Sequence, residues 1–150
     1  MAKKQKEIDG AFVKIPLGEG EHSYGRKLEG ALYAFYDAKA REDLPLIEVR
    51  VRPVLFKIWV MSRAVTSGRW EIVGVAPLEE RLREQQFFFK QDIITKKLSI
   101  YSNGQERPAT REECEGLEKA AVWDAEHVED RLRDYYLGQP NKWVKSMKIK

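Results

Sequence analysis

The sequence contains few of the residues on which enzymes and metal sites most often depend. Its 150 residues include one cysteine, Cys114, and two histidines, His22 and His127. Neither histidine lies in a recognisable nucleophile signature, and Cys114 is expected to be an ordinary packed or surface thiol. Glu126, His127 and Asp130 are close in sequence, but no second histidine or cysteine pair accompanies them. We therefore expect no catalytic residues, no metal and no cofactor.

Signals for secretion and for membrane insertion are also missing. A single cysteine cannot form an intramolecular disulfide, which favours a reducing compartment. The basic start of the chain, residues 1–7, is not followed by an apolar segment and so does not resemble a signal peptide. No apolar run approaches the roughly 18 residues that a membrane span needs. The expected location is the cytoplasm, without a membrane partner.

The basic residues gather at the two ends of the chain. The formal net charge is +3, from 27 Lys and Arg against 24 Asp and Glu. Seven of the basic residues lie in 1–7 and 142–150, which leaves 20 basic and 23 acidic residues in 8–141. This distribution argues against a folded basic groove for nucleic acid. We expect one domain at 8–141, with flexible basic tails at 1–7 and 142–150 and with Trp143 exposed in the second tail.

The clearest local signal is a hairpin near the start of the chain. Val13, Ile15 and Leu17 recur with the period of two that places them on one face of a strand. Gly18 and Gly20 can adopt positive φ without steric cost, so they favour a chain reversal. A second strand that continues to about residue 28 is expected to pair with the first.

Further strands are predicted by apolar runs that turn residues separate. The alternation from Ile47 to Val51 is typical of a strand with one exposed face. The runs 54–61 and 70–75 are expected to pair with each other as a second hairpin. The predicted later strands are 30–36, 47–52, 54–61, 70–75, 87–91 and 98–101, of which the last two form a pair.

Helical signals are confined to the C-terminal part. Thr110 and Glu113 have the spacing of a capping box, which predicts a short helix. Asp124 can cap a second helix from 125 to about 137, which Gly138 stops and in which Glu129 can pair with Arg133. The expected fold is α+β: a strongly bent antiparallel sheet or half-open small barrel of about seven to nine short strands, with one or two C-terminal helices packed on it.

Three separated segments resemble the immunity protein 26 family, whose members neutralise toxins that competing bacteria deploy. They are the hairpin 10–26, the segment Trp70-Glu71-Ile72-Val73-Gly74 followed by Pro77-Leu78, and Ala121-Val122-Trp123-Asp124 with Val128-Glu129-Asp130-Arg131-Leu132. The resemblance implies a bacterial, cytoplasmic protein without enzymatic activity. It also implies that the chain binds the domain of a cognate toxin and blocks it by direct occlusion.

Two groups of residues are candidate contacts for that toxin. Glu19, Glu21 and His22 lie at the tip of the first hairpin, and Arg26 follows on its second strand. The second group is acidic and consists of Glu112, Glu113, Glu115, Glu126, Glu129 and Asp130. If the toxin is a nuclease, these residues could oppose the basic cleft in which the toxin binds its substrate. The alternatives are a structural ion pair for Arg26, and an ordinary solvated helical surface for the acidic residues.

A second hypothesis is a small-barrel module that binds nucleic acid or has a regulatory interaction. Arg50, Arg52 and Lys57 would then lie along one strand beside exposed aromatic residues. The acidic body of the chain weighs against this hypothesis, so a nucleic-acid partner is not expected. The oligomeric state stays open at this stage.

Overall fold

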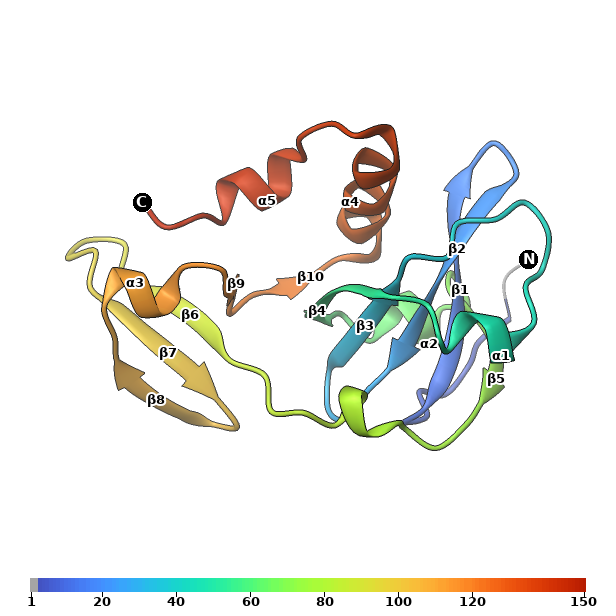
Figure 1. Cartoon of the computed structure of the whole chain (residues 1–150), viewed down its shortest axis with the longest axis horizontal. Coiled ribbons are helices and arrows are strands. Elements are labelled where there is room, and N and C mark those ends of the chain that lie inside the picture. The colour runs from blue at the N-terminus through green and yellow to red at the C-terminus, as the bar shows by residue number, and fades with distance from the viewer. Residues whose placement is uncertain (1–2) are drawn as a thin grey trace.

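The computed structural model describes residues 3–150, which form two open β-sheets and a set of mostly short helices (Figure 1). The first sheet contains β1 (Ala11–Gly18), β2 (Glu21–Lys27), β3 (Leu32–Tyr36), β4 (Val54–Val60), β5 (Glu71–Val75) and β10 (Val122–Trp123). Its strand order is β10-β4-β3-β2-β1-β5. All of these neighbours are antiparallel except β10 and β4.

The second sheet is smaller and lies at the other end of the molecule (Figure 1). It contains β6 (Phe88–Gln91), β7 (Leu98–Ser102), β8 (Gln105–Pro108) and β9 (Glu118–Lys119), in the order β8-β7-β6-β9. A contact between aromatic rings joins the sheets, because Trp59 of β4 lies 4.3 Å from Phe88 of β6, measured between ring centroids.

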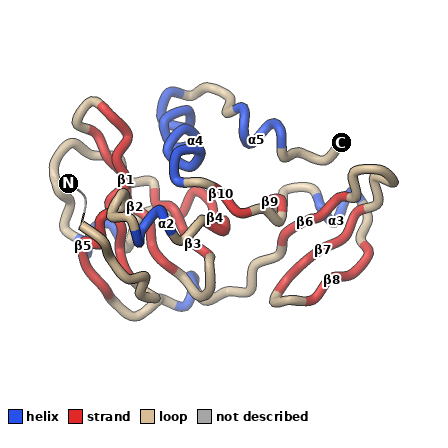
Figure 2. The backbone as a smooth tube through the Cα atoms, turned by 180° about the vertical axis from the view of Figure 1, so that it is seen from behind, coloured by secondary structure: helices blue, strands red, loops and turns tan. Residues whose placement is uncertain are grey.

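Helices α4 (Ala125–Leu137) and α5 (Lys142–Ser146), which follow each other near the end of the chain, lie on one side of the two sheets (Figure 1). The other helices are α1 (Leu46–Val49), α2 (Arg63–Thr66), the 3₁₀ helix η1 (Glu80–Leu82) and α3 (Arg111–Cys114). Helix α4 covers the first sheet, and α5 leads from it toward the second sheet, where the chain ends (Figures 1 and 2).

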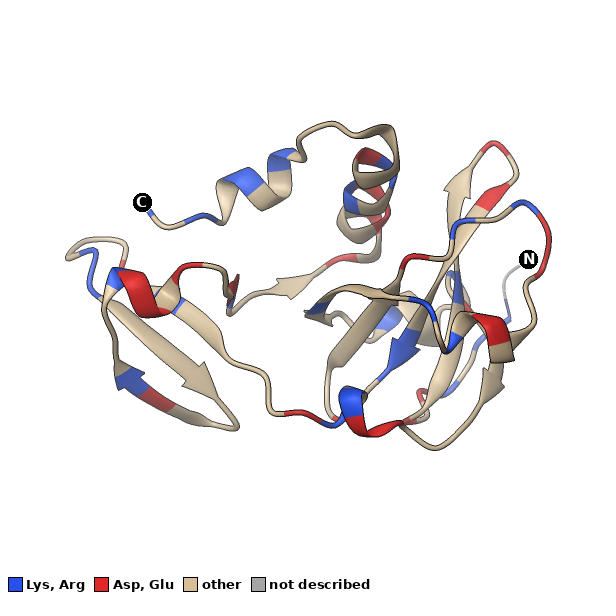
Figure 3. Cartoon of the chain, viewed as in Figure 1, with Lys and Arg blue, Asp and Glu red and all other residues tan. Residues whose placement is uncertain are grey.

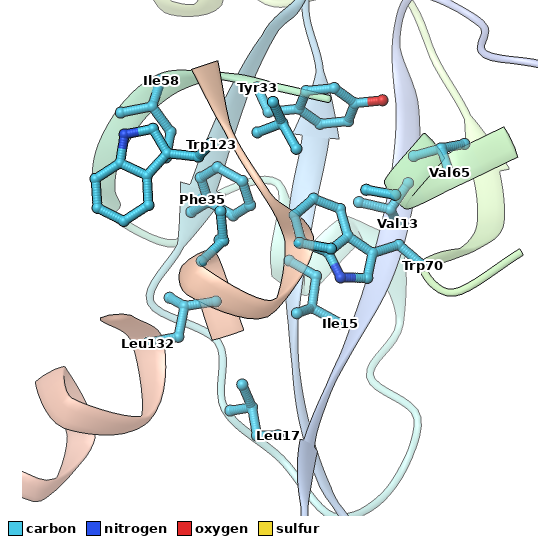
Figure 4. Packing of buried hydrophobic residues seen from close by; sticks show 14 residues of the cluster. Val13, Ile15, Leu17, Tyr33, Phe35, Ile58, Val65, Trp70, Trp123 and Leu132 are labelled. Carbon is cyan, nitrogen blue, oxygen red and sulfur yellow. The ribbon is translucent and has the colours of Figure 1, made fainter. Parts of the chain in front are cut away.

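The main core lies between the first sheet and α4 (Figure 4). Val13 and Ile15 of β1 are fully buried, as the period of two predicted, and Trp70 packs edge-on against Phe35. Helix α4 contributes Leu132, which is also fully buried. The opposite face of the same sheet carries a second cluster around Phe12, Tyr24 and Tyr36, so the sheet is buried on both faces.

The local turn and capping signals are confirmed. Gly18, Glu19 and Gly20 all have positive φ in the β1–β2 turn. The reciprocal capping box of Thr110 and Glu113 begins α3, and Gly138 ends α4 in the left-handed conformation. The α+β class is confirmed as well, with ten strands in two open sheets among the residues that the structure describes.

Three sequence predictions about these elements are wrong. Residues 46–49 form helix α1 and not a strand: Leu46 and Val49, three positions apart on one helical face, pack against the cluster around Phe12, and Ile47 is 73% exposed. Strand β5 pairs with β1, whereas the free edge of β4 pairs with β10. Residues 142–146 form α5, and Trp143 packs against the main core, so this part of the expected C-terminal tail is structured.

Candidate functional site

The acidic residues at the tip of the β1–β2 hairpin lie among basic neighbours. Glu19 is exposed, and its carbonyl oxygen accepts a hydrogen bond of 2.8 Å from Arg41. The Glu21 carboxylate lies 3.4 Å from the Lys39 ammonium and 3.9 Å from the Arg41 guanidinium. This tip therefore presents a charge-balanced surface, on which Glu19 is exposed and the Glu21 side chain is 27% exposed.

His22 is buried instead of exposed, which corrects its assignment as a partner contact. Only 5% of its surface is accessible, and its Nε2 lies 3.0 Å from the hydroxyl of Tyr24. Its backbone exchanges two hydrogen bonds of 2.9 Å with Ala40, which holds the 37–45 connection against β2. Burial, assisted by the charge of Lys14, lowers the pKa of His22 and favours the neutral imidazole.

Arg26 is a structural residue, so its assignment as a partner contact is also corrected. Its side chain is completely buried, and its Nε donates to the Gly10 carbonyl at 2.7 Å. The two terminal nitrogens donate to Tyr36, Glu79, Ala76 and Pro77 at 2.8–3.2 Å. The guanidinium also stacks on Phe12, with Cζ 3.9 Å from the ring centroid. The predicted alternative, a structural ion pair, is therefore what the structure contains.

Glu79 links this buried arginine to the surface. Burial alone would raise its pKa, but its own backbone N–H and the charges of Arg26 and Arg50 outweigh that effect and lower the pKa. The second carboxylate oxygen, Oε1, lies 2.7 Å from an Arg50 nitrogen without the alignment of a hydrogen bond. Arg26 and Glu79 thus join β2 to the segment that leads into η1.

The acidic residues of α3 are exposed and partly paired. Glu113 accepts from the backbone N–H of Thr110 and lies 3.0 Å from Arg107, and these contacts lower its pKa. Glu115 lies 3.7 Å from Arg111, and Glu112 is exposed. These carboxylates are accessible to a partner, although two of the three have a basic neighbour.

Glu129 of α4 is a structural residue. Glu129 is only 3% exposed and receives two hydrogen bonds of 2.7 and 2.8 Å from Arg69. It also accepts from the Trp70 indole at 2.9 Å. Glu129 therefore does not pair with Arg133 and does not face a partner, which corrects both predictions.

The other two candidate contacts on α4, Glu126 and Asp130, are more accessible than Glu129. Glu126 is exposed and lies 3.9 Å from Arg69. Asp130 accepts hydrogen bonds from Arg133 at 2.5 Å and from the Trp143 indole at 3.1 Å. Trp143 in turn stacks on His127 with 3.6 Å between ring centroids. Asp130 thus helps to seat α5 on α4.

A single acidic face formed by α3 and α4 is not present. Figure 3 shows that α3 borders the second sheet, whereas α4 lies over the first, with the acidic residues of each on separate parts of the molecule. The basic row expected for nucleic acid is not formed either. Arg50 follows α1, whereas Lys57 lies on β4 and donates to the Arg81 carbonyl at 2.8 Å.

Sequence reasoning missed the most exposed apolar site, which lies between β6 and β7. Ile93 is 85% exposed and Ile94 is 89% exposed, the highest values among the large hydrophobic residues of the described chain. The signal was visible as two adjacent isoleucines in a six-residue connection, Asp92-Ile93-Ile94-Thr95-Lys96-Lys97, where polar turn residues are the norm.

The remaining features offer little chemistry. A hollow of about 390 Å³ lies between α5 and the second sheet, bordered by Cys114, Leu117 and Met147. Burial raises the pKa of the Cys114 thiol, which disfavours the reactive thiolate. Within residues 3–150, no three His, Cys, Asp or Glu side chains gather in a way that could hold a metal ion. No helix in the same range is long and apolar enough to span a membrane.

Comparison with known proteins identifies the family of the chain. A family model described as Immunity protein 26 matches residues 8–99, which is more than half of the sequence. No curated protein and no solved structure gives a significant match. The matched part includes β1 to β6, the two isoleucines and the start of β7. The chain therefore belongs to the immunity protein 26 family.

Proposed function

We propose that this immunity protein acts in the bacterial cytoplasm by binding the domain of a cognate antibacterial toxin and blocking it by direct occlusion, without catalysis of its own. The observation that carries the proposal is the family match over residues 8–99. A stable interface of this kind buries about 800 Å² on each partner. The total accessible surface of 9107 Å² leaves ample room for such a patch.

The contacts between the two sheets support their action as one unit. Arg131 of α4 forms two hydrogen bonds, of 3.0 and 2.8 Å, with the carboxylate of Glu118 on β9. Its guanidinium also lies over the Phe56 ring of β4, with Cζ 3.7 Å from the centroid. A bidentate pair that is stacked on an aromatic ring is geometrically specific. We therefore propose that residues 8–141 form one binding body.

The acidic residues that are exposed or partly exposed stay candidate contacts within this proposal. Glu19 and Glu21 belong to the first hairpin, Glu112, Glu113 and Glu115 to α3, and Glu126 to α4. Because the two helices present their charges separately, a basic cleft on a nuclease toxin could meet one of them but not one continuous face. Reversing the charge of Glu112, Glu113 and Glu115 together tests the α3 group. Unchanged affinity would remove it from the interface.

The experiment that tests occlusion first asks whether the adjacent upstream gene encodes a large protein with a secretion module and a variable C-terminal toxin domain, and then pairs this chain with that domain. Cells that produce the toxin domain should survive only when this chain is co-expressed, and purified partners should form a stoichiometric complex in isothermal titration calorimetry. The toxin's activity in vitro should fall in proportion to the complex formed. Protection without direct binding, or binding that leaves the toxin active, would contradict occlusion.

The nucleic-acid alternative has a direct test of its own. Electrophoretic shift of DNA or RNA at low salt, with affinity that falls steeply as salt rises, would support a nucleic-acid module. We expect no shift, because Arg50 is engaged with Glu79 and the residues 8–141 carry more acidic than basic side chains.

A further inference from the structure

The connection between β6 and β7 exposes two large aliphatic side chains that the fold does not use. We call residues 92–97 the isoleucine tip. Ile93 and Ile94 are 85% and 89% exposed, and neither belongs to any of the four buried clusters. Single exposed hydrophobic residues are common on protein surfaces, but two adjacent ones at the end of a hairpin form a compact apolar knob.

The turn itself is held by polar contacts and not by the isoleucines. The Asp92 carboxylate accepts from the backbone N–H groups of Ile94 and Thr95, both at 2.8 Å. Two further backbone bonds close the loop, from Asp92 to the carbonyl of Lys97 at 2.9 Å and from Lys96 to the carbonyl of Asp92 at 3.0 Å. Polar residues at positions 93 and 94 would therefore be compatible with the same turn.

The isoleucine tip is also braced from the C-terminus. Lys150 donates its backbone N–H to the Gln91 side chain at 2.8 Å, and the Gln91 amide donates back to the Lys150 carbonyl at 3.2 Å. Figures 1 and 2 both show the chain end beside this loop. A preformed, braced loop loses less conformational entropy on binding than a mobile one.

Four lysines lie near the two isoleucines, together with the Asp92 carboxylate of the turn. Lys96 and Lys97 belong to the tip, and Lys148 and Lys150 belong to the chain end, which is hydrogen-bonded to Gln91 beside the tip. None of these four lysines forms an ion pair with the residues that the structure describes, whereas Asp92 is occupied by the turn. The surface that best complements this arrangement is an apolar pocket with an acidic rim.

We propose that the isoleucine tip is the anchor by which this chain binds its toxin, with Ile93 and Ile94 inserted into an apolar pocket rimmed by Asp and Glu side chains. This inference rests on the proposed function, because that function supplies a protein partner. Central apolar anchors commonly carry most of the energy of an interface, and peripheral charges mainly accelerate association. The exposed acidic residues described above would then lie outside the centre of the interface.

The test uses two double variants with matched chemistry. Ile93→Ser with Ile94→Ser removes the knob, and Ile47→Ser with Val51→Ser is the control, because those two side chains are 73% and 75% exposed at a distant site. Binding to the catalytically inactivated toxin domain is measured by calorimetry, and folding by urea denaturation. We expect the tip variant to bind at least about a hundredfold more weakly, the control to bind within about threefold of the unaltered chain, and both to remain folded.

The outcomes separate this inference from the proposed function. If the unaltered chain binds the toxin and the tip variant binds equally well, the isoleucine anchor is overturned while occlusion stands. If the unaltered chain does not bind, both fail. If the tip variant retains toxin affinity but loses self-association in ultracentrifugation, or loses binding to phosphatidylserine vesicles, the knob serves a second copy or a lipid surface, and the inference is overturned.

The lysines give an independent measurement of the acidic rim. Lys96→Glu with Lys97→Glu should slow association about tenfold or more at low salt, and this difference should shrink as salt rises. An association rate that is equal to that of the unaltered chain at low salt would contradict the acidic rim.

Discussion

Replacing Arg26 with methionine should destabilise the protein more than any surface substitution, because it removes the guanidinium that donates every hydrogen bond from the centre of a buried polar network. Methionine keeps much of the side-chain volume and removes the guanidinium. The backbone carbonyl groups of Ala76 and Pro77 would lose the hydrogen bonds that Arg26 donates to them. The Gly10 carbonyl would lose one of its two and keep the bond of 3.2 Å from the Ala76 N–H. Glu79 would lose its hydrogen bond from Arg26 and keep its own backbone N–H and its contact with Arg50.

The magnitude follows from what is left unpaired. Each buried acceptor without a donor costs about 1–3 kcal/mol, and removal of one partner from a buried ion pair typically costs about 3–5 kcal/mol. The lost stacking on Phe12 adds to the cost, whereas local relaxation and the buried methionine offset part of it. We therefore expect the free energy of unfolding to fall by about 3–5 kcal/mol, which is a large share of a typical stability of about 5–15 kcal/mol.

Urea denaturation followed by tryptophan fluorescence measures this loss. Arg83→Met is the matched control, because Arg83 is exposed and its replacement should change the free energy of unfolding by about 0.5 kcal/mol or less. Arg26→Lys keeps the charge without the fork of donors, so it should give an intermediate loss even if the methionine variant does not fold. A loss below about 1 kcal/mol for Arg26→Met would refute the network argument.

Three further predictions concern other parts of the fold. Gly10→Ala should destabilise the protein far more than Gly18→Ala in thermal unfolding. Both glycines have positive φ, but only at Gly10 would the new Cβ meet a backbone oxygen, 2.2 Å away. Equal losses of stability in the two variants would contradict this expectation. Glu129→Ala should lower the free energy of unfolding by about 1–3 kcal/mol through the unpaired Trp70 indole, and Glu129→Gln should recover part of it. Burial raises the pKa of Tyr136 to about 12, so its contribution to stability is complete below pH 10 and is lost as the pH rises toward 12. In Tyr136→Phe the free energy of unfolding should therefore fall less steeply as the pH rises from 10 to 12. The same slope in both proteins would contradict a contribution from Tyr136.

Local sequence signals predicted the parts of the fold that depend on neighbouring residues. The glycines of the first turn, the Thr110 capping box and the stop at Gly138 act over a few residues, and all three are present in the structure. The alternation at 47–51 misled because Ile47 and Val51 are exposed, whereas α1 packs Leu46 and Val49, three positions apart, against the cluster around Phe12. Periodicity over so few residues does not separate a strand from one helical turn.

The candidate site was harder to predict because burial is set by distant partners. Arg26 meets Glu79, which lies 53 positions later, and Glu129 meets Arg69, which lies 60 positions earlier. Sequence spacing contains no information on such pairs without knowledge of the topology. Composition therefore suggested exposed charges where the structure contains buried networks. The paired isoleucines, in contrast, were visible in the sequence, but their exposure became apparent only when the turn around them was known.

The pairing of acidic residues with arginines also determines which surfaces of the protein can attract a charged partner over a distance. Counted by residue, the segment from Glu106 to Asp134 is acidic, yet Glu129, Asp130 and Glu118 are each bound to an arginine within 3 Å. Paired charges of opposite sign create little potential at a distance, so the acidic count overstates the field of α4. The lysines at and beside the isoleucine tip form no ion pair with an acidic residue within residues 3–150, so no directly paired carboxylate cancels their electrostatic potential. Steering of an approaching protein should thus come from the basic end of the molecule, even though the body of the chain carries more acidic than basic residues.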